Sequence, residues 1–409
     1  MKAQSTKSEA DAAIKVMLVD PSLFTGPYDA ALTAGLLASA VQPWWATRAT
    51  RSGDCQEIPV EFVDSFFYRR TDHLVAVPQP VRSLIKGIAH FMGLCKLVSR
   101  VLRRRPDVVH FQWTVIPALD TLMIGLIRLA CPVVLTVHDT VPFNGERMSL
   151  LQNLGFDLPL RIADRIIVHT QDGRNTLIAR GVPATKIVVI PHGPLRLRAT
   201  PTMPTTPRDP RWTFLLFGEI KPYKGINVLI DALSLLTPLH CAQTRVIIAG
   251  RPRMDMSLTQ SRIATLELNS VIEMRLHRHS EQEMADLFAE TDCFLFPYHK
   301  IDASGVYFLV KPLGKWMIAS RVGIFAEDMQ QPTDGVLVPG GNSAALAFAI
   351  TNAITRRPSR TPSNHHTSWN AIGKLTRACY LSAIDQFNPA PLSKSDNVAP
   401  IEPVIDQIR

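Results

Sequence analysis

The chain has 409 residues, of which 46% are hydrophobic and 19% are charged, a composition typical of an ordinary globular protein. A single hydrophobic core rarely organises so long a chain, so we expect two domains. The formal net charge of +9 indicates an anionic partner, and nucleotide diphosphates, membrane lipid headgroups and nucleic acid would each satisfy it. The six cysteines are scattered singly without a C-x-x-C pair, which argues against a zinc site or a disulfide framework and favours reduced thiols in the cytoplasm.

Neither a secretion signal nor a membrane span is expected. Residues 1–13 are polar and carry several charges, so they lack the apolar core of a signal peptide. The longest apolar stretch, Leu119–Val137, approaches spanning length, but Arg128 and Pro132 interrupt it. We expect a buried helix followed by a buried strand there, and only peripheral contact with any membrane.

The first half of the chain alternates short β-branched runs with segments of helical periodicity. This alternation is typical of βα units and predicts a parallel sheet in a Rossmann-like domain, which we assign to residues 1–195. The expected strands are Ile14–Val19, Val60–Asp64, Val108–Phe111, Val133–Val137, Arg165–Val168 and Ile187–Ile190.

Within this half, Val81–Arg105 is predicted to be a basic amphipathic helix, and no acidic residue occurs between Asp72 and Asp107. At about 100° per residue, its basic side chains except Arg105 fall on one side. A solvated outer face would explain this pattern, but a one-sided cationic face also suits an anionic membrane surface. Nucleic acid is the rival partner, without a recognisable binding motif, so we expect membrane contact. The basic residues are Arg82, Lys86, Lys96, Arg100, Arg103, Arg104 and Arg105.

A linker and a second α/β series follow. Residues 196–211 are rich in proline and threonine without apolar periodicity, which predicts an interdomain linker. A second Rossmann-like domain is expected over 212–365, with a capping box at Ser280 and Glu283. Residues 366–388 should contain a C-terminal helix and 389–409 a poorly ordered tail. The expected strands of the second domain are Trp212–Phe217, Arg245–Ala249, Val271–Arg275, Cys293–Phe296 and Trp316–Ala319.

Two lysines follow the strand that ends at Gly218. Lys221 and Lys224 lie between this strand and a helix expected to begin near Gly225. Backbone N–H groups and the helix dipole favour a phosphate at such a position, so a diphosphate fits. The alternative is a surface loop whose lysines are merely solvated.

A second motif spans residues 292–320. A buried strand leads into Pro297-Tyr298, a loop carries Asp302-Ala303-Ser304-Gly305, and a short apolar helix precedes the next strand. This arrangement resembles the C-terminal domain of the retaining family-four glycosyltransferases. Further stretches that resemble this family lie at 136–139, 163–170, 190–193 and 224–225, so the resemblance spans residues 105 to 325 approximately.

The resemblance implies a GT-B fold, an α/β architecture in which two Rossmann-like domains face each other across a cleft. It implies that Ser304, Gly305 and Val306 bind the diphosphate of a nucleotide-sugar donor, beside Gly218 and Lys221, and that Lys224 neutralises the leaving group. Such stabilisation is needed because negative charge builds on the departing phosphate. The chain has no Asp-x-Asp triplet, so neither a metal nor a separate cofactor is expected.

Other candidate residues lie nearer the sugar. His138 ends a strand, where it would either satisfy backbone groups or, as the resemblance implies, contact the donor sugar. Asp302 matches the first of two family glutamates and would contact the transferred sugar. For an acceptor pocket the candidates are Gly26, His110 and Trp113, although core packing explains the two aromatic rings equally well.

Two positions depart from the family pattern. Glu219 stands where family members carry a phosphate-binding arginine, and Val310 stands where they carry the second glutamate. We expect transfer of a hexose from a nucleotide sugar to a lipid-linked saccharide at the inner membrane face, with retention of configuration. Because of these departures, a non-catalytic sugar-nucleotide-binding or scaffold subunit and a GT-B epimerase stay as alternatives.

Overall fold

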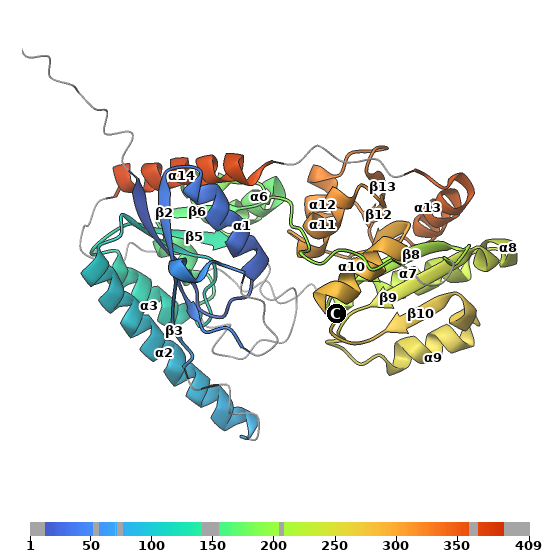
Figure 1. The fold of residues 1–409 in the computed structure, drawn as a ribbon, viewed down its shortest axis with the longest axis horizontal. Helices are drawn as coiled ribbons and strands as arrows, with labels where there is room; N and C mark the ends of the chain where they lie inside the picture. The colour runs from blue at the N-terminus through green and yellow to red at the C-terminus, as the bar shows by residue number, and fades with distance from the viewer. Residues whose placement is uncertain are drawn as a thin grey trace, which may run out of the picture.

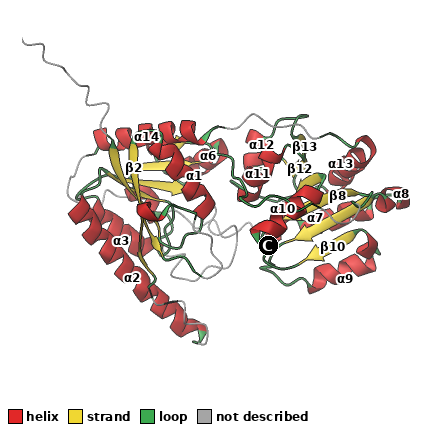
Figure 2. Ribbon diagram, viewed as in Figure 1, coloured by secondary structure: helices red, strands yellow, loops and turns green. Residues whose placement is uncertain are grey.

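The computed structural model describes residues 13–51, 57–69, 71, 77–140, 155–203, 208–359 and 367–387. Within these ranges the chain forms two parallel sheets, each covered by helices (Figures 1 and 2), as expected for a GT-B fold. The predictions for residues 1–12, Cys55 and the tail from 389 concern residues outside the described ranges.

The N-terminal sheet has seven strands in the order β3-β2-β1-β4-β5-β6-β7. All neighbouring strands pair in parallel, and the central strands are buried on both faces, which explains their nearly continuous apolar sequences. The strands are β1 (Ile14–Asp20), β2 (Val41–Arg48), β3 (Val63–Phe67), β4 (Val108–Phe111), β5 (Val133–Val137), β6 (Arg165–Val168) and β7 (Ile187–Val189). The helices are α1 (Gly26–Leu37), α2 (Gln79–Arg104), α3 (Pro117–Ile127), α5 (Leu158–Ile162) and α6 (Gln171–Ala179).

The C-terminal sheet has six parallel strands in the order β10-β9-β8-β11-β12-β13. The strands are β8 (Trp212–Phe217), β9 (Thr244–Ala249), β10 (Ile272–Arg275), β11 (Cys293–Phe296), β12 (Trp316–Ser320) and β13 (Gly335–Val338). The helices are α7 (Ile226–Ser234), α8 (Pro238–Ala242), α9 (Ser257–Thr265), α10 (Glu281–Glu290), α11 (Gly305–Val310), α12 (Gly323–Asp328) and α13 (Ser343–Arg356). The predicted capping box of Ser280 and Glu283 begins α10.

One predicted strand needs correction, and two strands were missed. Val60–Phe62 forms a 3-10 turn, so β3 begins only at Val63. The sequence pattern missed β2, whose Pro43, Trp44 and Arg48 break the apolar run, although its inward side chains are buried. It also missed β13, which is short and begins with a glycine.

The last helix, α14 (Trp369–Asp385), returns to the N-terminal domain and packs across α1 (Figure 1). The two helices touch at glycines, since a Cβ on Gly373 would lie 2.0 Å from the carbonyl oxygen of Gly35. Trp369 adds a hydrogen bond from its indole N–H to the carbonyl oxygen of Pro194, at 2.8 Å. The chain therefore passes between the domains twice.

Candidate active site

Residues just beyond the carboxyl ends of β4, β5, β8 and β9 lie at the boundary between the domains. Glu327 of α12 accepts hydrogen bonds from the backbone N–H groups of Gln171 and Asp172, both at 2.7 Å. These groups form the first turn of α6, where a carboxylate is favoured by the exposed N–H groups and the helix dipole. The domain boundary is therefore held by specific polar contacts.

Lys224 lies inside the C-terminal domain rather than on its surface. The side chain is 3% exposed, and its Nζ donates to the carbonyl oxygen of Phe217 and to the Tyr298 hydroxyl, both at 2.8 Å. Burial, with a contribution from Lys221, lowers the pKa of Lys224 to about 7, although Glu219 opposes the shift. The Lys224 ammonium is therefore the poorly solvated cation that an incoming anion would stabilise.

Gly218 makes this burial possible. Its φ is +102°, and a Cβ there would lie 2.9 Å from Lys224 Nζ and 3.0 Å from a methyl of Val306. Gly218, Lys224 and Val306 thus form one packed group. That this group binds the donor stays a prediction.

Asp302 bridges the two domains. It is 7% exposed, and one carboxylate oxygen accepts from the hydroxyl of Thr140 at 2.6 Å and from the backbone N–H of the same residue. Arg180 fixes Thr140 in turn by donating to its carbonyl oxygen at 2.6 Å. Asp302 therefore lies at the domain boundary, as the sequence predicted, with its carboxylate engaged.

Ser304 and Gly305 begin α11. The Ser304 hydroxyl accepts from the backbone N–H of Tyr307 at 3.4 Å, so it caps the helix. Gly305 is exposed, and a Cβ there would meet nothing within 4 Å. Val310, at the other end of α11, is 1% exposed and lies in the apolar core. Its apolar side chain therefore needs no hydrogen-bond partner there.

A cavity of about 630 Å³, here named the histidine cavity, lies between the domains. His138, Trp113 and Gln112 line it from the N-terminal domain. The C-terminal domain contributes Lys221 and, with it, the pair of Glu219 and Arg253. Within the described ranges no cluster of three metal-ligating side chains occurs.

The charges around Glu219 explain how the cavity tolerates a carboxylate. Its side chain forms ion pairs with Arg253 at 2.5 Å and with Lys221 at 3.4 Å. Burial raises the pKa of Glu219, but the Arg253 and Lys221 contacts outweigh it and leave that pKa below its usual value. Two cations thus contact this carboxylate and offset its charge.

His138 belongs to a chain of hydrogen-bonded rings. His169 donates from Nδ1 to the carbonyl oxygen of Ile190 at 3.0 Å, so its Nε2 is the acceptor facing His138 Nδ1 at 3.2 Å. His138 Nε2 lies 3.2 Å from Oε1 of Gln112, an oxygen that can only accept, so this contact favours a proton on Nε2 and opposes the contact with His169. Burial, together with His169 and His192, lowers the pKa of His138 well below its usual value. The His138 ring is therefore neutral.

The three acceptor-side candidates separate in the structure. Trp113 stacks on His138, with 4.8 Å between ring centroids and 17° between planes, and lines the histidine cavity. His110 does not reach any described cavity: it is 1% exposed and bonds to Tyr380 and Thr136, at 2.7 Å each. It is therefore a core residue, because its two ring nitrogens are satisfied between the sheet and α14. Gly26 lines a different cavity, described below.

Comparison with known families identifies the chain. The model of Glycosyltransferase Family 4 matches residues 31–193, and that of Glycosyl transferases group 1 matches residues 211–356. Together they cover well over half of the chain. It belongs to the group 1 glycosyltransferases of the family-four type.

Individual relatives of this glycosyltransferase are distant. The D-inositol 3-phosphate glycosyltransferase of Geodermatophilus obscurus is 22% identical over 329 residues, which cover 73% of this chain and 72% of that protein. The GDP-mannose:glycolipid 4-beta-D-mannosyltransferase of Xanthomonas campestris pv. campestris is 25% identical over 181 residues, 44% of this chain and 51% of that protein. The structure of Anabaena HepE in complex with UDP-glucose is 18% identical with a TM-score of 0.60, covering 92% of this chain and 96% of that one. That likeness supports the GT-B fold.

Sequence patterns did not single out several residues of the glycosyltransferase site. Arg253 lies just after β9, where the bridge between Ile220 and Pro252 brings it beside Glu219. His169 lies in a stretch that resembles the family, but only the three-dimensional contact with His138 reveals its role. Gln112 and Arg180 carry no local motif at all.

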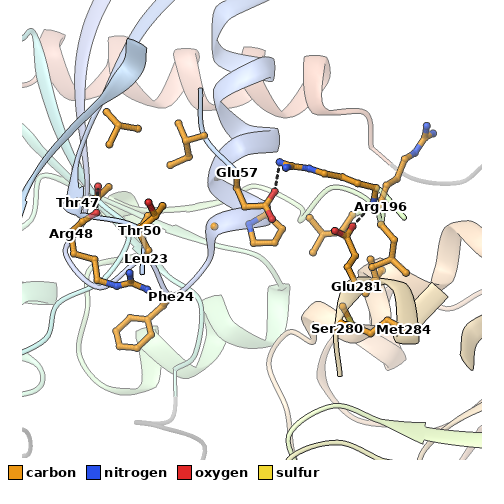
Figure 3. A pocket seen from close by; sticks show the side chains of 18 of the residues that line it. Leu23, Phe24, Thr47, Arg48, Thr50, Glu57, Arg196, Ser280, Glu281 and Met284 are labelled. Carbon is orange, nitrogen blue, oxygen red and sulfur yellow. Dashed lines mark hydrogen bonds and ion pairs between the residues drawn. The ribbon is translucent and has the colours of Figure 1, made fainter. Parts of the chain in front are cut away.

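A second cavity of about 670 Å³, here named the interdomain cavity, adjoins the first, since Phe24 lines both. Figure 3 shows Leu23, Phe24 and Arg48 on its N-terminal side, opposite Glu281 and Met284. Arg198 crosses the domain boundary by pairing with Glu57 at 2.5 Å. The cavity has both polar and apolar walls, as a saccharide site requires.

The basic side chains of helix α2 were expected to form one solvent-exposed cationic face, but several of them contact other groups of the protein. Arg100 pairs with Asp64 at 3.2 Å, and the guanidinium of Arg104 lies over the ring of Trp44 at 2.9 Å. Arg82 and Arg103 contact polar groups of their own helix, whereas Lys86 and Lys96 are exposed. The cationic side is therefore partly used in packing.

The same helix has an exposed apolar side. Its spacing of three and four residues forms a stripe next to the basic side, and the N-terminal end of α2 projects beyond the sheet (Figure 1). No helix in the described part of the chain combines the length and apolarity needed to cross a bilayer. The exposed residues of the stripe are Val81, Leu84, Ile88, Phe91, Met92 and Leu102, and those of neighbouring α3 and its end are Leu122, Leu126 and Leu129.

Proposed function

We propose that this glycosyltransferase transfers a hexose from a nucleotide-sugar donor to a lipid-linked saccharide at the inner face of a membrane, in surface or exopolysaccharide assembly. The observation that carries the proposal is the histidine cavity, which has His138 on one wall and Lys221 with Arg253 on the other. The relatives named for transfer to inositol phosphate and to a glycolipid, and the neighbour solved with UDP-glucose, support it.

The cationic wall suits the leaving diphosphate. Departure of the nucleoside diphosphate leaves an oxocarbenium-like sugar and builds negative charge on phosphate, which preorganised cations stabilise. Family members carry a phosphate-binding arginine at the position of Glu219. In this chain Arg253 would supply the guanidinium instead, because its side chain pairs with that of Glu219 at 2.5 Å. Lys224 and the open backbone at Gly305 complete the proposed phosphate site.

At the transferred sugar, the proposed reaction requires hydrogen-bonding groups rather than a general acid. In the retaining reaction that we propose, the acceptor hydroxyl attacks from the face that the diphosphate leaves, and a phosphate oxygen takes its proton. In its neutral Nδ1–H form, His138 would accept from a sugar hydroxyl through Nε2, and this hydroxyl would displace Oε1 of Gln112. Asp302 would contact the transferred sugar after exchanging its contact with Thr140.

The exposed stripe of α2 supports a membrane location. Leu84 is 65% exposed and Met92 is 55% exposed, which is costly in water and favourable in the interfacial region of a bilayer. Lys86 and Lys96 lie beside the stripe, where each exposed cation near an anionic surface contributes about 1 kcal/mol. Vesicle sedimentation with and without anionic lipid tests this part, and the Leu84→Ser and Ile88→Ser double variant should bind more weakly.

The activity is tested by nucleotide release from a panel of UDP-, GDP- and ADP-sugars, with and without a bacterial membrane lipid extract. We expect one donor to be turned over, with stimulation by the extract and strong loss in the Lys224→Ala and Asp302→Ala variants. Nucleotide binding without turnover of any donor would instead indicate a non-catalytic subunit. Interconversion of the donor sugar without an acceptor would indicate an epimerase.

A further inference from the structure

A buried chain of hydrogen-bonded side chains joins the end of β3 to helices α2 and α3. The two helices lie side by side (Figure 1). His90 of α2 is fully buried, and its Nε2 lies 2.7 Å from Oδ1 of Asp120, in the first turn of α3. The hydroxyl of Tyr68, the residue after β3, lies 2.9 Å from His90 Nδ1. Both ring nitrogens of His90 are therefore engaged inside the N-terminal domain.

Asp120 also binds the backbone that precedes α3. Its Oδ2 accepts from the backbone N–H of Val115 at 2.6 Å and from that of Ile116 at 2.8 Å. An ionised carboxylate can only accept, so the proton of the 2.7 Å contact lies on His90 Nε2. Because Asp120 is buried, its charge depends on these three donors.

The backbone that Asp120 holds belongs to a wall of the histidine cavity. Trp113 and Val115 both line this cavity. The Trp113 ring stacks on His138, and its Nε1 donates to the hydroxyl of Thr25 at 3.2 Å. Since Val115 is only two residues further along, the contact with Asp120 limits where the Trp113 ring can lie. The His90 side chain thus reaches the cavity wall through two successive hydrogen bonds.

We propose that His90 is a positioning residue for the acceptor, an inference that rests on the proposed transferase function. By donating to Asp120, His90 fixes the loop of residues 113–116 and holds Trp113 against His138. Without this donor, a buried carboxylate oxygen lacks a hydrogen bond, and the loop rearranges to satisfy it. The helix that carries the exposed apolar stripe therefore also sets one wall of the proposed acceptor site.

The first test observes Trp113 in the full-length protein without any substrate. In nitrogen-15 spectra, the indole N–H signal of Trp113 is identified by its loss in Trp113→Phe. We expect His90→Leu, which removes the donor, to shift this signal and to speed exchange of the indole proton with solvent. His90→Gln carries an amide N–H that can donate to Asp120, so it should restore the wild-type signal. Leu97→Ala, at another buried position of α2, is the control for loss of packing and should leave the signal unchanged.

The second test compares the acceptor with the donor. Nucleotide release is measured with the accepted donor and increasing amounts of a bacterial membrane lipid extract. For His90→Leu we expect the half-saturating amount of extract to rise about tenfold, with a donor KM within about twofold of the wild type. A double-mutant cycle with Asp120→Asn tests the route. Because both substitutions disrupt the same contact, the double variant should lose no more than the more affected single variant.

Four results would overturn the proposal or one part of it. An unshifted Trp113 signal in folded His90→Leu rejects the positioning role, and so does an equal shift in Leu97→Ala. Additive losses in the cycle reject the route through Asp120. Equal effects on the donor KM and on half-saturation by the extract reject a role specific to the acceptor.

Two further measurements keep these outcomes distinct. If His90→Leu does not fold, the Trp113 signal is read in Asp120→Asn, where an unshifted signal rejects the proposal in the same way. A shifted signal in a protein that turns over no donor supports the contact from His90 to the cavity wall and rejects only the transferase function.

Discussion

The carboxylate of Asp302, in the C-terminal domain, accepts two hydrogen bonds from Thr140, in the N-terminal domain. The contact joins the proposed sugar-binding loop to the end of β5, next to His138. Because the Asp302 carboxylate is occupied, a donor sugar has to compete with Thr140 for it. The same contact therefore links the relative position of the domains to occupancy of the site.

Asp302→Asn and Thr140→Val separate these two roles. Asn keeps an oxygen for Thr140 but loses the charge proposed to act on the sugar, so we expect turnover to fall about 100-fold. Val removes only the hydroxyl and leaves the backbone N–H, so we expect a loss of no more than about tenfold. The kcat and KM of each variant, measured with the accepted donor, check this, and equal losses would contradict a separate role for Asp302.

Nucleotide binding should take up a proton at mildly alkaline pH. Burial holds the pKa of Lys224 at about 7, and a neighbouring diphosphate favours the charged form and raises that pKa. At about pH 8 the free protein is mostly neutral at this site and the complex protonated, whereas at about pH 6 both are protonated. Calorimetry in two buffers of different ionisation enthalpy measures the uptake. Lys224→Met should abolish it, while Lys221→Gln should retain it.

Glu219 and Arg253 should affect nucleotide affinity in opposite directions. Glu219→Gln leaves Arg253 and Lys221 without their shared anion, so a nucleoside diphosphate should bind more tightly. Arg253→Gln leaves the carboxylate less compensated and should weaken binding. Both side chains are nearly half exposed, so each effect should be about fivefold or less. A weakening by both variants in equilibrium titrations would rule out this arrangement of charges.

Acid should destabilise the N-terminal domain well above the range where carboxylates titrate. Burial lowers the pKa of His110 to about 3 and that of His169 to about 4, and also lowers those of His138 and His192. Below a pH of about 6.5 these histidines bind protons in the unfolded chain but not in the folded chain. The free energy of unfolding therefore falls with falling pH, by about 1.4 kcal/mol per pH unit for each such histidine. Urea midpoints between about pH 7 and 4.5 measure this slope. His169→Gln should flatten it, and the exposed His277→Gln should not.

His169 should determine which nitrogen of His138 carries the proton. Its Nε2 can accept only from an Nδ1–H of His138, whereas Oε1 of Gln112 can accept only from an Nε2–H. Because Ile190 fixes the His169 tautomer, we expect wild-type His138 to be the Nδ1–H tautomer. In His169→Gln the amide can donate instead, which favours the Nε2–H tautomer and removes the acceptor offered to the sugar. Nitrogen-15 spectra of labelled imidazoles report the tautomer directly, with His138→Gln identifying the signal. An unchanged tautomer would show that Ile190 and His169 do not set it.

Sequence patterns were sufficient for the fold because each domain repeats the same local unit. The runs of β4, β5, β6, β8 and β11 are mostly apolar and mostly buried on both faces, which indicates a covered parallel sheet. Trp45 shows where this reasoning fails. It is fully buried in β2, but Pro43 and Arg48 in the same strand interrupt the apolar pattern that would predict it.

The site was only partly predictable because its contacts are long-range. Lys224 follows a strand, which the sequence shows, but its burial depends on the 3-10 turn of Pro222–Lys224 and on Gly225 at a φ of +68°. His110 lies near the end of β4 and His138 directly follows β5, yet the partner of His110, Tyr380, lies 270 residues away in α14. No local pattern distinguishes these two histidines.

The return of α14 to the first domain constrains how the enzyme can open. A single linker would let the second domain swivel freely, whereas two crossings of the chain, one beyond β7 and one before α14, permit mainly rotation about the line that joins them. The close contact between Gly35 and Gly373 fixes one end of that line to α1. Opening would therefore widen the cleft without sliding one wall along the other. Each residue of one wall would face the same residue of the other wall in the open and the closed states.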